Sequence, residues 1–274
     1  MSQPSDHPLI RHPKALCNQL RRIAIEAGEL TLDYFDEAGC SQDQVNAKGD
    51  GSPVTLADQK AEQLIEKALL EAVPGVPMIG EESVAEGRKT DLSAQDYFWL
   101  VDPLDGTKEF ISGSGDYTVN IALIYKGEPI VGVVYAPVKG ELYAAHGAGT
   151  AIRWLEESDK EKEISVRKPP AEGLTVVSSR SHGNNDRLDQ YLSQHKIQKI
   201  IKRGSSLKIC AVACGKADVY PRFGPTCEWD TAAGDAVLRG AGGLITDIDG
   251  TMFTYGGKNE KFLNPEFIAS SGHI

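Results

Sequence analysis

The sequence predicts a layered protein that combines an α+β part with an α/β part, and changes in the pattern of apolar residues carry that prediction. Two amphipathic helical segments open the chain, and a run of short apolar strands with glycine turns follows them. From residue 173 onward, strands alternate with helices. We therefore expect an N-terminal α+β lobe with a large, mainly antiparallel sheet (residues 1–165) and a C-terminal α/β lobe (residues 166–274) packed closely against it.

The first third of the chain supplies two helices and a hairpin. Apolar residues recur at helical spacing over residues 14–38 and again over residues 56–72. Between these segments, Gly-Asp-Gly at residues 49–51 separates two short extended runs and predicts a hairpin tip. Short apolar runs at residues 76–79 and 97–101 suit strands.

The remaining elements follow from turn residues and periodicity. We expect meander strands at residues 118–125, 129–136, 141–145 and 150–154, with Lys-Gly pairs at two of the turns. The charged residues 156–162 predict a surface loop. The alternating part contains expected strands at 174–177, 199–202, 217–220, 244–246 and 267–269 and expected helices at 186–193, 205–214 and 230–239.

Composition and charge narrow the class of function. The chain has 274 residues, of which 41% are hydrophobic and 25% charged, as in ordinary globular proteins. The formal net charge of −10 and the lack of a basic cluster argue against a nucleic-acid partner. No apolar run approaches the length of a membrane span and the N-terminus lacks an apolar signal core, so we expect a cytoplasmic protein. The five cysteines form no CxxC and suggest neither a disulfide framework nor a zinc ribbon.

The acidic stretch Asp-Pro-Leu-Asp-Gly-Thr at residues 102–107 follows an expected strand. Two aspartates this close repel each other when both are ionised, and a divalent cation would remove that penalty. Gly106 permits a close approach of the backbone, and Thr107 would open a helix whose N–H groups can receive a phosphate oxygen. The stretch alone is weak, because Asp-Gly is common in turns.

Two further acidic elements lie at similar junctions. Glu81 follows the expected strand at residues 76–79, and Asp230 starts an expected helix. Alone, a Glu-Glu pair is typical of a solvated surface and Asp230 is typical of a helix N-cap. In layered α/β structures such junctions converge on one crevice. Together these oxygen ligands predict a site for magnesium or manganese, which could activate a water and stabilise a leaving oxygen.

At these residues the chain resembles the inositol monophosphatase superfamily of lithium-sensitive, magnesium-dependent phosphatases. The family's elements are similar to Gly-Glu-Glu at 80–82, residues 102–107 and Trp-Asp at 229–230, in the same order. The resemblance covers nearly the whole chain and implies the αβαβα sugar-phosphatase fold. Lys-Glu-Phe-Ile at 108–111 and the segment 220–226 look like the 3′(2′),5′-bisphosphate nucleotidases of the CysQ type.

The resemblance implies two magnesium sites, which manganese could also fill. Glu81, Asp102 and the Leu104 carbonyl would hold the first ion, and Asp102, Asp105 and Asp230 the second. A third, weaker site would involve Glu81 and the hairpin near Asp50.

The resemblance also implies catalytic and substrate-binding roles. Asp58, in a Thr-Leu-Ala-Asp context that matches the family's Thr-x-x-Asp, would pair with Thr107 to orient and deprotonate the attacking water, with Glu81 in the same catalytic set. Lys208 would meet a 5′-phosphate and His182 a nucleotide, whereas Arg222 stays unassigned. The implied substrate-binding residues are Glu81, Leu104, Asp105, Gly106, Thr107, Asp230, His182, Ser205 and Lys208.

The function implied in this way is hydrolysis of the 3′-phosphate of adenosine 3′,5′-bisphosphate (PAP) to AMP and phosphate, in sulfur assimilation and nucleotide recycling. The sulfated analogue PAPS is a second implied substrate. Inositol monophosphate or fructose 1,6-bisphosphate as substrate is the alternative, and a non-catalytic metal or nucleotide sensor is a remote one. The sequence leaves open whether the protein is a monomer or a homodimer, and whether it associates peripherally with the cytoplasmic face of the inner membrane.

Overall fold

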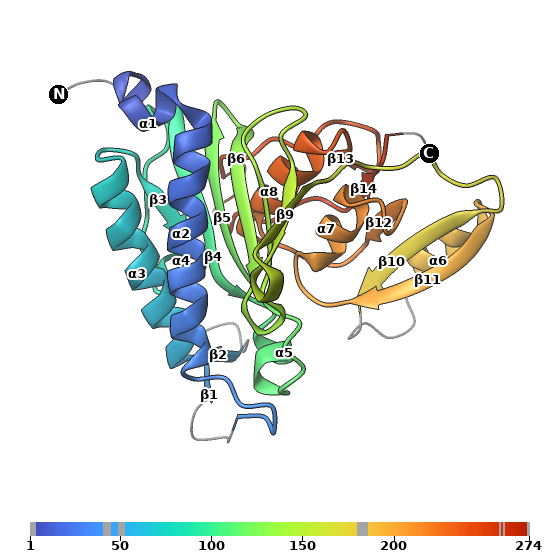
Figure 1. Ribbon diagram of the computed structural model, residues 1–274, viewed down its shortest axis with the longest axis horizontal. Helices are drawn as coiled ribbons and strands as arrows, with labels where there is room; N and C mark the ends of the chain where they lie inside the picture. Colours follow the sequence, from blue (N-terminus) through green and yellow to red (C-terminus); the bar gives the residue numbers. More distant parts are fainter. Residues whose placement is uncertain are drawn as a thin grey trace.

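Two β-sheets and the helices around them form five layers, in the order helix, sheet, helix, sheet, helix (Figure 1). This computed structural model describes residues 4–40, 45–48, 53–179, 186–257, 259 and 261–272. Helices α2 (Pro13–Leu32) and α3 (Leu56–Ala72) cover one face of the larger sheet, and α8 (Glu228–Gly240) covers the other. The expected layered αβαβα fold is therefore confirmed.

The larger sheet has the strand order β3-β4-β5-β6-β7-β8-β9 within the described residues. Only β3 and β4 run parallel, and every other neighbouring pair is antiparallel, as the expected meander requires. Its strands are β3 (Met78–Gly80), β4 (Tyr97–Asp105), β5 (Thr118–Tyr125), β6 (Glu128–Ala136), β7 (Glu141–Ala145), β8 (Ile152–Leu155) and β9 (Lys160–Glu163).

The second sheet has the order β11-β10-β12-β14-β13, with parallel pairs on both sides of β10 and antiparallel pairs on both sides of β14. Helix α7 (Leu207–Ala213) packs with α8 between the two sheets. Helix α6 (Asp186–Ser193) lies on the outer face, where its Tyr191 and Leu192 pack against the cluster of Leu174, Val176 and Val219. The strands are β10 (Leu174–Ser179), β11 (Ile197–Arg203), β12 (Val219–Arg222), β13 (Leu244–Asp247) and β14 (Phe267–Ser270).

Strand β4 divides its side chains between two apolar cores. Trp99 and Val101 join the core under α2 and α3, whereas Phe98 and Leu100 join the core shared with α7 and α8. This period-two alternation continues to Asp102, which therefore faces the α8 side of the sheet. The acidic stretch is thus directed toward the helix that carries Asp230.

The first helix ends earlier than its apolar pattern predicts, at Leu32 rather than near residue 38. Phe35, beyond the end, packs against Phe110 and Tyr117 with ring centroids 5.6 and 5.8 Å away. Tyr34, whose helical spacing extended the predicted helix, packs against the same small separate core around Leu104, so its spacing is misleading.

The predicted surface loop at residues 156–162 is also wrong. A 3₁₀ turn at Glu156–Ser158 is followed by β9, which pairs with β8 and has four exposed side chains, Lys160 to Glu163. β9 is an edge strand whose charged side chains are exposed on both faces. Its amino-acid composition therefore resembles that of a surface loop and gives no sign of a strand.

The N-terminal hairpin forms as predicted: β1 (Val45–Ala47) pairs with β2 (Pro53–Thr55). Its tip, with Asp50, lies outside the described residues, so the third metal site stays a prediction. The remaining short elements are α1 (Pro8–Arg11), α4 (Glu81–Ala85), α5 (Thr107–Ile111) and 3₁₀ turns at Pro4–Asp6 and Pro137–Lys139.

The expected boundary near residue 165 falls between the last strand of the larger sheet and the first of the smaller one. One apolar core nevertheless joins both parts, because α7 and α8 pack between the sheets, and the division into lobes stays a prediction.

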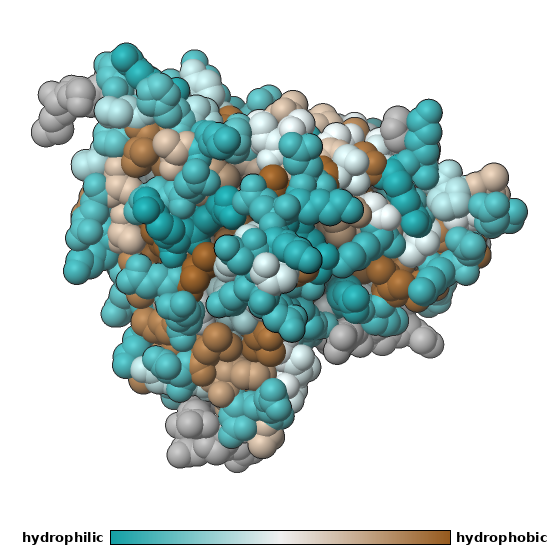
Figure 2. Space-filling view, viewed as in Figure 1, coloured by the Kyte–Doolittle hydropathy of each residue, from teal (hydrophilic) through white to brown (hydrophobic). Residues whose placement is uncertain are grey.

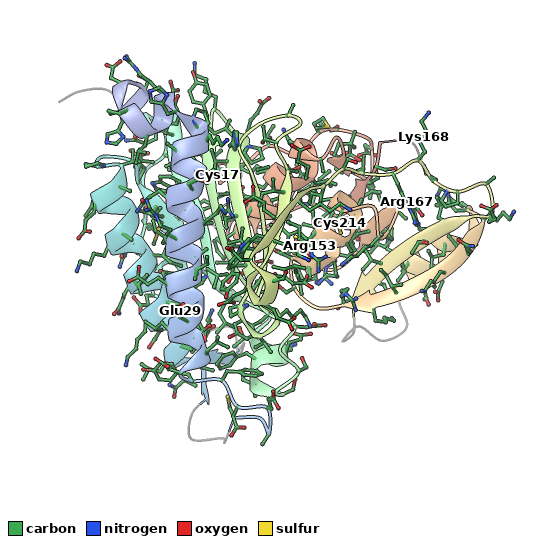
Figure 3. All side chains as sticks on the ribbon, viewed as in Figure 1. Cys17, Glu29, Arg153, Arg167, Lys168 and Cys214 are labelled. Carbon is green, nitrogen blue, oxygen red and sulfur yellow. The ribbon has the colours of Figure 1, made fainter. Side chains whose placement is uncertain are left out.

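No described helix is long and apolar enough to cross a membrane. Hydrophilic side chains dominate the face in Figure 2. Figure 3 shows Cys17 on α2 far from Cys214, at the end of α7.

Candidate active site

The acidic residues at the ends of β3 and β4 lie side by side. The two strands are parallel, with Gly80 opposite Val101, so Glu81 and Asp102 follow at neighbouring positions. Asp102 is almost fully buried, at 1% exposure. Strand β4 continues through Asp105, with an irregularity opposite β5 between the two aspartates, although the sequence placed its end at residue 101.

Asp230 joins this group from α8. It is the third residue of the helix, and its Oδ2 accepts the N–H of the N-terminal cap residue Cys227 at 2.8 Å. Burial, together with the charges of Asp105 and Glu81, raises the pKa of Asp230 to about 8. Burial and then Glu81, Asp105 and Asp230 raise the pKa of Asp102 well above its usual range. The charges of Glu81 and Asp105 thus act on both Asp102 and Asp230, while the convergence of these carboxylates on a cation site stays a prediction.

Lys48, a hairpin residue with no role predicted from the sequence, also belongs to this cluster. The ammonium of Lys48 lies 2.5 Å from Glu81 Oε1 and 2.7 Å from Glu82 Oε1, and its side chain is only 7% exposed. Burial outweighs this lysine and raises the pKa of Glu82 to about 7. Nothing in the local pattern of residues around Lys48 could have revealed this contact, because it depends on how the hairpin folds onto α4.

Glu62 of α3 anchors α4 and was also missed. Its carboxylate accepts the backbone N–H groups of Glu82 and Ser83, both at 2.8 Å, and the Ser83 hydroxyl. A Cβ on Gly80 would lie 2.5 Å from that carboxyl group, so the approach requires glycine. In the helical pattern of α3, residue 62 is a polar position between apolar ones, and that pattern does not indicate a contact with α4.

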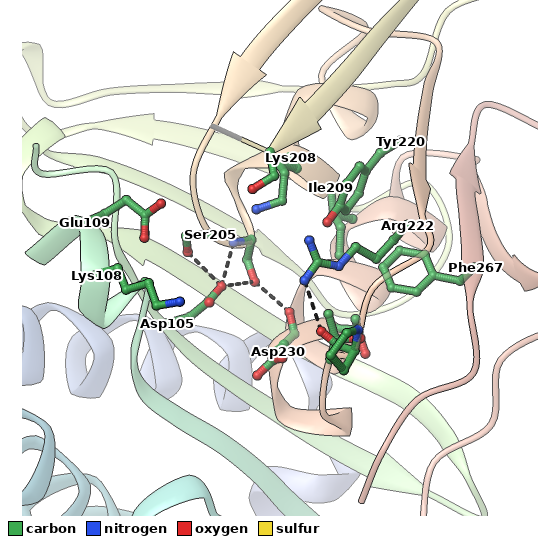
Figure 4. Close-up of a pocket in the computed structure, with 16 residues that line it drawn as sticks. Asp105, Lys108, Glu109, Ser205, Lys208, Ile209, Tyr220, Arg222, Asp230 and Phe267 are labelled. Carbon is green, nitrogen blue, oxygen red and sulfur yellow. Dashed lines mark hydrogen bonds between the residues drawn. The ribbon is translucent and has the colours of Figure 1, made fainter. Parts of the chain in front are cut away.

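Asp105 is held by a turn from the second half of the chain. Its Oδ2 accepts the Ser205 hydroxyl and the Ser206 N–H, both at 2.7 Å (Figure 4). The Ser206 hydroxyl also lies 2.7 Å from the backbone carbonyl of Asp230. Ser205, expected to contact substrate, therefore contacts a candidate metal ligand in this structure, although it also lines the adjoining cavity.

The donor set fits a hard divalent cation in its chemistry. All expected ligands are oxygens, and burial together with the charges of Glu81, Asp105 and Asp230 raises the pKa of Asp102, a cost of ionisation that a bound cation would lower. Among the described residues, no three acidic, histidine or cysteine side chains surround one point closely enough to hold a metal ion as they stand. Lys48 contacts Glu81, and the Ser205–Ser206 turn holds Asp105.

Asp58 and Thr107 face each other as expected. Asp58 is the third residue of α3, and its Oδ2 accepts the N–H and the hydroxyl of the cap residue Thr55 at 2.9 and 2.6 Å. Its Oδ1 lies 3.4 Å from the Thr107 hydroxyl, which is also 3.5 Å from the Leu104 carbonyl oxygen. Burial raises the pKa of Asp58 to about 6, against the opposing bonds from Thr55. Gly106, before Thr107, has φ +99°, a conformation that glycine favours.

A cavity of about 380 Å³ extends from Asp105 and Asp230 toward the second sheet (Figure 4). Lys208 lies in its wall at 8% exposure, with its ammonium 5.5 Å from the centre of the Tyr220 ring. Arg222, which the sequence left unassigned, lines the same cavity and donates to the Gly224 and Pro225 carbonyls. His182 lies outside the described residues, so its role stays a prediction.

Comparison with known proteins agrees with this geometry. Residues 13–271 match the inositol monophosphatase family. The chain is 46% identical to the 3′(2′),5′-bisphosphate nucleotidase CysQ of Escherichia coli K12 over 93% of this chain and 99% of that protein. It is 40% identical to the protein of the same name from Buchnera aphidicola, over 94% of both. The structure of CysQ from Bacteroides thetaiotaomicron superposes with a TM-score of 0.77 and 35% identity, covering 94% of this chain and 97% of the other. The chain thus belongs to the inositol monophosphatase family.

Proposed function

We propose that this protein is a metal-dependent phosphatase that hydrolyses the 3′-phosphate of PAP to AMP and inorganic phosphate, and that it also accepts PAPS. One observation carries the proposal: the carboxylates of Asp105 and Asp230 and the buried Lys208 line the same cavity. The carboxylates suit a phosphate ester with bound cations, and the lysine suits a second phosphate. The curated relatives named above carry the same activity in their names.

The cluster of acidic residues supports phosphate-ester hydrolysis. Glu81, Asp102 and the Leu104 carbonyl would hold one magnesium ion, and Asp102, Asp105 and Asp230 a second, with manganese as a substitute and a third site near Asp50. When bound, such ions supply Lewis acidity to the attacking water and to the leaving 3′-oxygen. Without cations, these carboxylates would repel the substrate they are proposed to serve.

The chain's own contribution to water activation is the Asp58–Thr107 pair. The 3.4 Å contact places the Thr107 hydroxyl where it can bond both the Asp58 carboxylate and a water molecule. Thr55 fixes the orientation of Asp58, so the second oxygen of that carboxylate stays directed at Thr107. The proton lost by the water would pass through Thr107 to Asp58.

Lys208 and Arg222, in the wall of the cavity, support a substrate with two phosphates. Among the described residues no carboxylate forms an ion pair with Lys208, and burial lowers the pKa of this lysine. An anionic group in the cavity would stabilise its charged form, and the 5′-phosphate of PAP is such a group. Arg222 adds a second cation on the same wall. An inositol monophosphate has no second phosphate to offer them.

Phosphate release tests the proposal. The enzyme is assayed on PAP, 3′-AMP and inositol 1-phosphate with a magnesium titration and added lithium. We expect PAP to be the best substrate, no turnover without a divalent cation, and inhibition by lithium. An Asp105→Asn variant should lose most of its turnover even at saturating magnesium, and near-wild-type turnover of that variant would sink the metal assignment.

Lys208→Met tests the substrate half of the proposal. It should lower kcat/KM for PAP about 10- to 100-fold, because a charged hydrogen bond to the 5′-phosphate is lost. Its kcat/KM for 3′-AMP, which has no 5′-phosphate, should change little and serves as the internal control. Equal losses on both substrates would contradict the assignment of Lys208 to the second phosphate.

A further inference from the structure

Two buried polar residues of β5 lie directly opposite the two aspartates of β4. In the strand register Asn120 pairs with Asp102 and Thr118 pairs with Asp105. Both are fully buried, and the next residues on the same face, Ala122 and Ile124, are apolar and belong to the core. Polar groups in such a place destabilise a fold unless they are hydrogen-bonded, so their partners indicate what they do.

Their partners are the serines that hold Asp105. The Thr118 hydroxyl bonds to the Ser205 hydroxyl, and the Asn120 amide donates to the Ser206 hydroxyl at 3.0 Å. The Thr118 hydroxyl also lies 3.0 Å from Asn120 Oδ1, which is its alternative acceptor. A continuous set of hydrogen bonds therefore runs from the middle of the larger sheet, through the Ser205–Ser206 turn, to Asp105 Oδ2.

The turn itself is held in an unfavourable conformation. Ser205 has φ +52°, in the left-handed region that non-glycine residues rarely adopt. Residues in such conformations persist where their surroundings fix them, and they cluster at functional sites. Here Thr118 and Asp105 both bond the Ser205 hydroxyl, and Asn120 bonds its neighbour Ser206.

The number of hydrogens decides how the set is ordered. Each hydroxyl carries one, so Thr118 can donate to Asn120 or to Ser205 but not to both. With Asp105 as a carboxylate, the charge favours Ser205 donating to it, and Thr118 then donates to Ser205. That arrangement strengthens the Ser205–Asp105 bond, because each donor in the chain polarises the next.

We propose that Thr118 and Asn120 are positioning residues that orient Asp105 through the Ser205–Ser206 turn. They fix Oδ2 on the turn and leave Oδ1, which has no hydrogen-bond donor among the described residues, for a cation. The inference rests on the proposed function, which assigns Asp105 to a metal. It adds that the affinity of this metal depends on two residues that touch neither metal nor substrate.

The experiment measures manganese binding to the metal-stripped full-length protein, from the EPR signal of free Mn²⁺. Thr118→Val removes the hydroxyl with little change of shape, and we expect the Kd for Mn²⁺ to rise about tenfold. Thr118→Ser keeps the hydroxyl and should recover most of that affinity. The magnesium concentration for half-maximal PAP hydrolysis should rise by a similar factor in Thr118→Val, while kcat at saturating magnesium stays within about threefold of wild type.

Thr31→Val is the matched control. Thr31 is an equally buried threonine whose hydroxyl bonds to the Gly28 carbonyl and to Tyr117, on the opposite side of the sheet. It should lower the melting temperature without changing the Kd for Mn²⁺. If Thr118→Val binds Mn²⁺ like the wild type, or if Thr31→Val weakens binding equally, the inference is wrong.

Ser205→Gly provides a variant that folds more easily. Glycine adopts φ +52° without strain, but the donor to Asp105 is lost, so weaker Mn²⁺ binding is again expected. Unchanged binding in this variant would also overturn the inference. Because this measurement needs no substrate, it is separate from the proposed function: wild-type protein that binds Mn²⁺ but leaves PAP intact would contradict the function alone.

Discussion

The N-termini of α3 and α8 are built alike and lie on opposite faces of the larger sheet. Each helix has an aspartate as its third residue, Asp58 or Asp230, and each aspartate accepts the N–H of its cap residue with Oδ2. This reciprocal arrangement is a capping box, which stabilises helix starts generally. In both helices one carboxylate oxygen completes the cap and the other remains for chemistry.

The surroundings of the two caps differ. Within the described part of the chain, Asp58 is hydrogen-bonded by hydroxyl and N–H groups of Thr55 and Thr107, and burial, with a smaller contribution from Glu81, raises its pKa to about 6. Asp230 lies among other carboxylates as well as being buried, and its pKa is raised to about 8. The same local motif therefore yields a candidate proton acceptor in one place and a candidate metal ligand in the other, because the neighbours differ.

The largest expected effect is that of Asp230→Asn. The amide oxygen can still accept the Cys227 N–H, so the cap remains while the charge is lost. We expect kcat/KM for PAP to fall on the order of a thousandfold, because a cation site loses a ligand. The free energy of unfolding in EDTA should stay equal or rise, since an asparagine cannot ionise among the neighbouring carboxylates. Activity within tenfold of wild type would reduce Asp230 to a capping residue.

Asp58→Asn should have a smaller effect on catalysis and none on the metal. We expect a loss of about a hundredfold in kcat, typical of a proton acceptor, with the half-saturating magnesium concentration unchanged within about twofold. Thr107→Val should cause a similar loss, and the double variant little more, because the two residues act as a unit. Additive losses would show that the two side chains act independently.

The pH dependence of the rate follows from the raised pKa of Asp58. Below about pH 6 this carboxyl group is protonated in the folded protein and cannot accept a proton, so kcat should fall as the pH drops through about 6. Asp58→Asn should lack this acidic limb, which a pH–rate profile at saturating magnesium detects. The folded state also holds this proton more tightly than the unfolded chain, so this group's contribution to stability falls as pH rises from about 4 to about 6.

The smallest effects concern the cap residues. Thr55→Ala should lower the free energy of unfolding by about 1 kcal/mol, as for other threonine caps. Cys227→Ala should cost less, because a thiol is a weak hydrogen-bonding group. Urea denaturation of both variants measures the difference. A larger loss in Cys227→Ala would mean that the α8 cap depends on its side chain rather than on Asp230.

Much of the fold was predictable because its periodicities are strong. Helix α3 and strand β5 begin and end at the predicted residues, and the meander and the alternating half follow in order. The failures have physical causes. Tyr34 has helical spacing but packs against a tertiary cluster, and β9 is an edge strand with no buried side chain to mark it.

By itself, the sequence predicted that Glu81, Asp102, Asp105 and Asp230 lie near the ends of elements, because the apolar patterns end there, although β4 itself continues through Asp105. Only the tertiary structure decided that Lys48 contacts Glu81, that Ser205 and Ser206 hold Asp105, and that Thr118 and Asn120 hold those serines. These contacts join residues far apart along the chain. Local periodicity reports which side of an element is buried, whereas partners across layers depend on how the layers pack.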